Sequence, residues 1–171
     1  MYRLFIANKN YSSWSLRPWV LMRSLGIDFE EHLEPFVEHD NGANFRRFSP
    51  TGKVPCLHDG ALQVWDSLAI VEYLAERFPE RGLWPVDSRS RANARSICAE
   101  MHAGFGALRS HCPMNIEASL PEVGARIWRE QASVRADVER VSAMWTELLA
   151  QQPEGSLLFG GFSIADAYYA P

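Results

Sequence analysis

The chain contains few cysteines, and none of them stands in a pattern typical of a disulfide framework or a dithiol site. Its three cysteines, Cys56, Cys98 and Cys112, are odd in number and far apart, and no Cys-x-x-Cys occurs. This spacing indicates reduced thiols and argues against a dithiol redox enzyme. The five histidines also lack metal-ligand spacing, so we expect no metal site.

The sequence also lacks a long hydrophobic run and a block of charge of one sign. No segment approaches the roughly 20 apolar residues of a membrane span, and the apolar residues 1–7 are too short a run for a signal peptide. The net charge is -4 with both signs interspersed, which favours neither nucleic acid nor an anionic membrane as a partner. We therefore expect a cytoplasmic protein with no nucleic-acid or membrane partner.

The hydrophobic residues that are present suffice for one large core or two small ones, since they make up 47% of 171 residues. In the first half of the chain, patterning predicts the order strand, helix, strand, helix, strand, strand, helix. Asp59-Gly60 is a strong signal for a two-residue hairpin between the last two strands. The expected strands are residues 4–7, 29–33, 54–58 and 61–64, and the expected helices are residues 14–25, 41–48 and 66–78.

Pro18 helps to place the start of the first helix. Proline is tolerated in a first turn but clashes with the carbonyl four residues back when it lies deeper. The helix is therefore expected to begin near Trp14 or Ser15, with Ser12 and Ser13 in the loop before it. Ser15 is expected to be the better capping residue.

A proline- and glycine-containing linker is expected to separate two domains, at residues 1–80 and 87–171, with the linker itself at 81–86. The second domain is predicted to be helical, from one apolar stripe through Ile97, Met101, Phe105 and Leu108 and another through Val134, Val138, Val141, Trp145 and Leu148. Ser163 and Asp166 form a capping box. The helix that they begin has too few residues after it to be stable alone, so we expect a fragment of a longer chain.

Three motifs together resemble the cytosolic glutathione transferases over the whole chain: Thr51-Gly52-Lys53-Val54-Pro55, the run from Asp66-Ser67 to Leu74, and the late capping box. The run Ser12-Ser13-Trp14-Ser15-Leu16-Arg17 is similar to the motif of the zeta class, the maleylacetoacetate isomerases, with Trp14 where that class has cysteine. The resemblance implies an α/β thioredoxin-like domain followed by an all-helical domain, here incomplete at its C-terminus. It also implies a homodimer and glutathione as the co-substrate.

The resemblance assigns the binding of glutathione to the first two motifs. Val54-Pro55 would be a cis bond that turns the Val54 amide and carbonyl toward the cysteinyl backbone; alone, it would more simply be a proline on a sheet edge. Asp66 and Ser67 would bind the γ-glutamyl ammonium and carboxylate, and they would also cap a helix. Lys53 is the candidate for the glycyl carboxylate.

The thiol of glutathione must be activated, because the thiolate is the nucleophile and a free thiol has a pKa of about 8.5. Ser12 and Ser13 are the candidate catalytic hydroxyls, and the two stay open as alternatives. Tyr11 is a weaker rival, since other classes use a tyrosine near the first strand. Arg17 is expected to steady the loop.

The electrophile is expected to bind between the domains. Trp14, His102, Phe105 and Arg109 are candidates for its site, with the last three placed on the first long helix; a core stripe explains Phe105 better. We expect a glutathione transferase that adds the thiol to a small, mostly apolar electrophile. The alternatives are a cis-trans isomerase of the maleylacetoacetate or maleylpyruvate type and a non-catalytic binding or interaction module.

Overall fold

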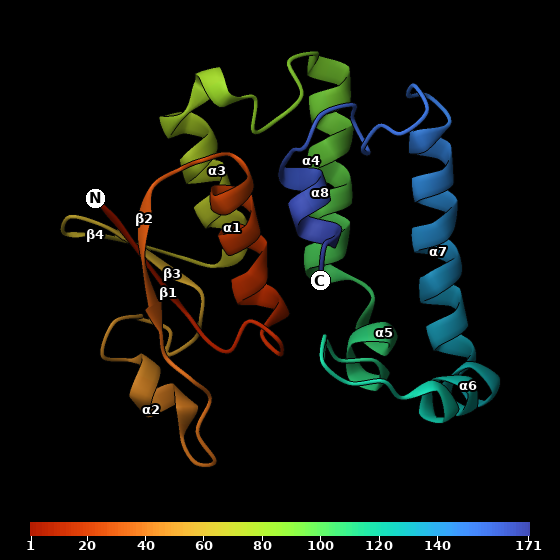
Figure 1. The fold of residues 1–171 in the computed structure, drawn as a ribbon, viewed down its shortest axis with the longest axis horizontal. Helices are drawn as coiled ribbons and strands as arrows, with labels where there is room; N and C mark the ends of the chain where they lie inside the picture. Colours follow the sequence, from red (N-terminus) through yellow and green to blue (C-terminus); the bar gives the residue numbers. More distant parts are fainter.

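The computed structural model describes residues 1–171, and its first half is a four-stranded sheet with helices beside it (Figure 1). Strand β1 is parallel to β2, whereas β3 and β4 are antiparallel to their neighbours, in the spatial order β2-β1-β3-β4. The strands are β1 (Tyr2–Ile6), β2 (Phe29–Leu33), β3 (Cys56–Asp59) and β4 (Leu62–Trp65), and the helices are α1 (Ser13–Ser24), α2 (Asn41–Phe45) and α3 (Ser67–Arg77). The predicted thioredoxin-like order βαβαββα is confirmed.

The second half is helical, as predicted from its apolar stripes. A short turn at Pro79–Arg81 leads to α4 (Ser88–Ala103), α5 (Gly106–His111), α6 (Pro121–Glu130), α7 (Ala132–Leu149) and α8 (Ile164–Tyr169). Helix α8 packs against both α4 and α1, and α7 forms the outer side of the molecule (Figure 1). None of the helices has both the length and the apolar content that crossing a membrane requires.

Strand β1 separates two hydrophobic cores because its side chains alternate between the faces of the sheet. Leu4 and Ile6 face the larger core, which continues through α1, α3, α4, α7 and α8. Phe5 and Ala7 face a smaller core on the side of α2. The smaller core is completed by three buried side chains: Phe45, Phe48 and Cys56.

Two local boundaries differ from the sequence prediction. Helix α1 begins at Ser13 with Ser12 as its N-cap, so Pro18 lies inside the helix, deeper than the rule for a first turn allows. The hairpin turn consists of Gly60 and Ala61, one residue later than predicted, because Asp59 still pairs with Leu62. Gly60 has φ +59, a left-handed conformation that glycine adopts at little cost.

The first long helix ends earlier than its apolar stripe suggested. Helix α4 stops at Ala103, and Phe105 starts α5 with φ +56, so Phe105 and Arg109 do not lie on the first long helix. Gly104 marks the break, because a Cβ there would lie only 2.7 Å from the Glu100 carbonyl oxygen. The single stripe from Ile97 to Leu108 is thus divided between two helices.

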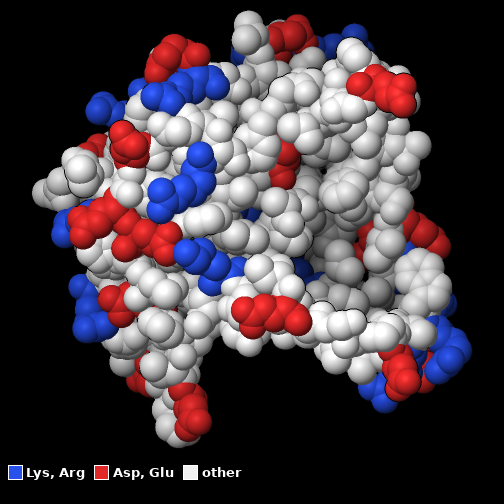
Figure 2. All heavy atoms as spheres, viewed as in Figure 1, with Lys and Arg blue, Asp and Glu red and all other residues white.

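The surface carries charges of both signs in close alternation. On the face seen in Figure 2, Lys and Arg side chains lie beside Asp and Glu side chains, and no area of one sign dominates. Ion pairs of the protein include Arg140 with Glu100 at 2.6 Å and Arg95 with Glu72 at 3.0 Å. The interspersed pattern of the sequence therefore persists on this face of the folded surface.

Candidate functional site

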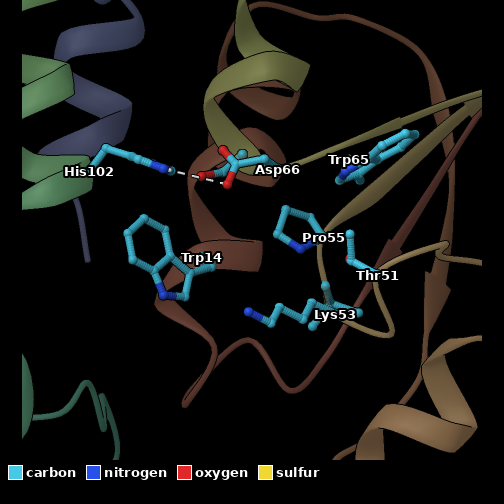
Figure 3. A pocket seen from close by; sticks show the side chains of 9 residues that line it. Trp14, Thr51, Lys53, Pro55, Trp65, Asp66 and His102 are labelled. Atoms are coloured by element: carbon cyan, nitrogen blue, oxygen red, sulfur yellow. Dashed lines mark ion pairs between the residues drawn. The ribbon is translucent and has the colours of Figure 1, made fainter.

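A cavity of about 440 Å³ lies where the sheet, α1, α3 and α4 come together (Figure 3). Its volume is within the usual range of small-molecule sites. Residues distant in the sequence line it: Trp14, Thr51, Lys53, Val54, Pro55, Trp65, Asp66, Ser67 and His102. Six of the predicted site residues before the linker therefore line the same cavity as His102, a residue of α4.

The segment before β3 offers an unpaired backbone to this cavity. The Val54–Pro55 peptide bond is cis, and the Val54 amide and carbonyl make no hydrogen bond within the protein. Unpaired backbone groups next to a sheet can accept an extended peptide as one more strand. Lys53 is exposed, and in Figure 3 its amino group extends below Pro55 toward Trp14.

Gly52 allows the segment before β3 to lie close to α2. Its φ is +65, and a Cβ at this position would lie 2.8 Å from the Gly42 carbonyl oxygen. Any side chain here would therefore move the backbone as well as strain it. Thr51 and Lys53, on either side of the glycine, both line the cavity.

Asp66 caps α3 in an unusual backbone conformation. Its φ is +70, and one carboxylate oxygen, Oδ1, accepts a hydrogen bond from the Leu68 amide at 2.9 Å. Such conformations cost about 1–3 kcal/mol and occur most often at binding sites. The other oxygen, Oδ2, lies 3.5 Å from His102 Nε2 of α4.

Ser67 is more enclosed than the sequence suggested. Its side chain is buried, and its hydroxyl lies 3.0 Å from the hydroxyl of Tyr168 in α8. Burial of the phenol, which disfavours its ionised form, raises the pKa of Tyr168, although the hydrogen bond with Ser67 opposes the change. A serine hydroxyl has one donor and two acceptor positions, so that of Ser67 can still form hydrogen bonds with a ligand.

The serines before α1 have different environments. Ser12 is buried and is the N-cap, contrary to the expectation that Ser15 would fill this role. Its hydroxyl donates to Ser15 Oγ at 2.9 Å, and Ser15 Oγ also accepts from the Ala7 amide. Ser13 is half-buried and its hydroxyl has no partner, while Tyr11 is exposed.

The Trp14 ring lies close to two cationic side chains. The guanidinium of Arg17 lies 4.4 Å from the centre of the Trp14 rings, and that of Arg109 lies 5.0 Å away. Arg17 is buried, its Nε donates to the Tyr168 carbonyl, and its Nη1 has no partner. Desolvation on burial lowers the pKa of Arg17 to about 10.

Two of the four residues predicted for the electrophile line the cavity, and two do not. Trp14 and His102 lie on its wall. Phe105 is 7% exposed and belongs to the large core. Arg109 lies behind Trp14, and its guanidinium donates to the carbonyls of Met101, His102 and Gly104.

The thiols and the candidate metal ligands do not form a site. Cys56 and Cys98 are buried, and burial raises the pKa of Cys56 to about 11, so both thiols stay protonated at neutral pH. Cys112 is exposed. No three His, Cys, Asp or Glu side chains come close enough together to hold a metal ion.

Sequence reasoning missed three residues of this region. Thr51 and Trp65 line the cavity, and both could have been found because they adjoin the predicted binding motifs. Tyr168 contacts Ser67 across 101 positions of sequence, and no local pattern indicates such a contact.

The family model of the glutathione S-transferase N-terminal domain matches residues 11–77. The solved glutathione transferase homolog from Burkholderia GL BGR1, with bound glutathione, shares this fold with a TM-score of 0.67 at 20% identity, covering 99% of this chain and 77% of that one. Residues 11–77 belong to the glutathione S-transferase N-terminal domain family, and the chain as a whole has the fold of the solved glutathione transferases. All the residues that line the cavity belong to this matched segment except His102.

Relatives of the chain include zeta-class proteins. Glutathione S-transferase Z1 of Arabidopsis thaliana is 35% identical over 89 residues, which are 49% of this chain and 40% of that protein. A probable maleylacetoacetate isomerase of Caenorhabditis elegans is 27% identical over 161 residues, 94% of this chain and 72% of that protein. The chain thus spans about 40% of the length of the plant relatives that it matches.

Proposed function

We propose that the protein binds glutathione in this cavity and adds its thiol to a small electrophile. The observation that carries the proposal is the meeting of the unpaired Val54 backbone with Asp66 at the start of α3, in one cavity of suitable volume. The Val54 amide and carbonyl would pair with the cysteinyl residue. Asp66 would bind the γ-glutamyl ammonium, and the free amides at the N-terminus of α3 would bind its carboxylate.

Ser13 is the better candidate for the hydroxyl that stabilises the thiolate. The Ser12 hydroxyl is already committed to Ser15, whereas the Ser13 hydroxyl has no partner at the N-terminus of α1. Lowering a thiol pKa by about 2 units requires about 2.7 kcal/mol of preferential stabilisation of the thiolate. One hydroxyl donor and a helix N-terminus can supply this amount.

The isomerase alternative needs a carboxylate-binding arginine that faces the electrophile. Arg109 already donates to three backbone carbonyls, and Arg17 is buried behind Trp14. Neither guanidinium presents a free pair of donors to the cavity. The transferase reading is therefore preferred over the isomerase, although zeta-class proteins are among the relatives.

The test is retention on immobilised glutathione, followed by conjugation of glutathione to a panel of model electrophiles across a range of pH. We expect binding and turnover, and we expect Ser13→Ala to raise the pH midpoint of conjugation by about 1–2 units. Ser12→Ala should instead lower thermal stability by about 1 kcal/mol, as loss of a helix cap does. Tyr11→Phe is the matched control and should leave the midpoint unchanged.

Two results would contradict this proposal. Binding without turnover across the panel would favour a non-catalytic module. If the pH midpoint of conjugation shifts only in Tyr11→Phe, the hydroxyl that stabilises the thiolate is that of Tyr11 and not that of Ser13. The homodimer that the family resemblance implies is part of the same proposal, and light scattering coupled to size-exclusion chromatography measures it.

A further inference from the structure

Arg17 carries a buried charge that no carboxylate of the protein pairs with. The residue is 3% exposed, its Nη1 has no hydrogen-bond partner, and none of the ion pairs includes it. Burial lowers the pKa of Arg17 to about 10, so the guanidinium is still protonated at neutral pH. A buried charge without a counter-ion is costly for stability, and charges of this kind are found most often at functional sites.

The titratable groups around this guanidinium do not offset its charge. They are Tyr168 and Tyr169 of α8, Cys98 of α4 and Arg109 of α5. Burial raises the pKa of both tyrosines and of the cysteine, so all three are neutral at pH 7, and Arg109 is a second cation. The positive field of Arg17 therefore acts on whatever lies near it.

The guanidinium lies beside a residue of the cavity wall. Its carbon is 4.4 Å from the centre of the Trp14 ring, and this ring lies across the cavity from Pro55 (Figure 3). Arg17 also follows Ser13 by four positions on α1, so the two side chains lie on one face of the helix, and that of Arg17 leans toward the helix N-terminus. The charge is therefore close to the place where the proposed function puts the thiol.

We propose that the buried charge of Arg17 stabilises the thiolate of bound glutathione through space, from behind Trp14 and without touching the sulfur. The inference rests on the function proposed above. A thiolate in contact with the Trp14 ring would lie about 8–10 Å from the guanidinium carbon. At an effective dielectric constant of about 20, one positive charge at this distance lowers the pKa of a thiol by about 1 unit. The thiol proton leaves for solvent, and Arg17 stays protonated throughout.

The other charged groups near the cavity act differently from Arg17. Lys53 is exposed, so water and salt screen its charge. The Asp66 carboxylate of α3 disfavours a second negative charge, and His102 of α4 lies 3.5 Å from it. Arg109 is half-buried, and it donates to backbone carbonyls at the end of α4. Arg17 is therefore the cation whose charge is screened least.

The test is the pH midpoint of conjugation for wild type, Arg17→Met, Arg17→Gln and Arg17→Lys. Both neutral variants should raise the midpoint by about 1 unit, so that turnover falls about fivefold at a pH near the wild-type midpoint and hardly changes near pH 9, where the thiol is ionised in every variant. Arg17→Lys keeps a positive charge, and its midpoint should lie closer to that of wild type than to those of the neutral variants. Arg23→Met, at an exposed arginine of the same helix, is the matched control and should leave the midpoint unchanged.

A second ligand separates the thiolate from the rest of glutathione. S-methylglutathione has no ionisable thiol, so titration calorimetry should show that it binds the neutral variants nearly as well as wild type. The inference is overturned by an unchanged midpoint in a folded neutral variant, by equal shifts in the neutral and lysine variants, by loss of S-methylglutathione binding, or by failure of both neutral variants to fold. Each of these results leaves the proposed function intact. Absence of glutathione binding and turnover in wild type overturns the proposed function and this inference with it.

Discussion

Arg17 shows how one residue acquires its role from packing. Its side chain is 3% exposed, and its guanidinium carbon lies 4.4 Å from the centre of the Trp14 ring and 5.4 Å from that of the Tyr168 ring. A buried guanidinium with an unpaired nitrogen is costly to desolvate, and no carboxylate pairs with it. Its contribution to stability should therefore come from stacking and from its aliphatic stem.

Replacement of Arg17 separates these contributions. Arg17→Met keeps the stem and removes the charge, so the free energy of unfolding should fall by no more than about 1 kcal/mol. Arg17→Lys keeps a buried charge without a planar group to stack on two rings, and it should cost about 2 kcal/mol. Urea denaturation at pH 7 measures both values. A methionine variant less stable than the lysine variant would mean that the charge itself stabilises the fold.

At the scale of the element, Glu31 joins β2 to α1 and to the loop before it. Its carboxylate accepts from Lys9 Nζ at 2.7 Å and from Trp19 Nε1 at 2.6 Å, and Arg23 lies 3.6 Å away. Burial alone would raise the pKa of Glu31, but the hydrogen bonds from Lys9 and Trp19 outweigh this effect, and the pKa is lowered. The charged carboxylate therefore stabilises the folded state.

The pH dependence of this contribution has a definite sign. Because the pKa of Glu31 is lower in the folded state, its stabilisation is present above the unfolded value of 4.5 and is lost as the pH falls through the folded value. Glu31→Gln should reduce the free energy of unfolding by about 1 kcal/mol at pH 7, and by less at pH 3. Urea denaturation at the two pH values measures this difference. Glu38→Gln, an exposed control without an ion pair, should change neither value, and an equal loss for Glu31→Gln at both pH values would contradict the linkage.

At the scale of the whole molecule, the helical part is not independent of the sheet. One core of 24 buried residues contains Leu4 of β1 and Tyr169 of α8. Polar contacts across the same boundary reinforce it, since Arg17 donates to the Tyr168 carbonyl and the Ser67 and Tyr168 hydroxyls lie 3.0 Å apart. The short α8 is thus stabilised by α1 and α4, which its own length would not achieve.

A shared core predicts a single unfolding transition for the chain. Far-UV circular dichroism reports on all the helices, and tryptophan fluorescence reports on both halves through Trp14, Trp19, Trp65, Trp84, Trp128 and Trp145. Urea denaturation curves from the two probes should coincide in midpoint and slope. Two separated transitions would show that the helices unfold independently of the sheet.

Local sequence patterns predicted much of the fold and part of the candidate site. The order of strands and helices follows from hydrophobic period and turn residues, and Asp66, expected to cap a helix, is the N-cap of α3. Local patterns could not decide which of Ser12, Ser13 and Ser15 is the N-cap of α1, because a serine at any of these positions can cap a helix. Ser12 is the N-cap in a fold where Ser15 Oγ accepts from the Ala7 amide of the segment after β1.

By itself, the sequence determined the thioredoxin-like order of elements and the motifs that place Val54 and Asp66 at one edge of the sheet. Only the tertiary structure decided that His102 faces Asp66, that Ser67 bonds to Tyr168 and that Arg17 is buried behind Trp14. Hydrophobic period and capping rules act over a few residues along the chain, whereas two of these contacts join residues 36 and 101 positions apart. Contacts of this kind depend on how whole helices pack, and packing is set by the complete core.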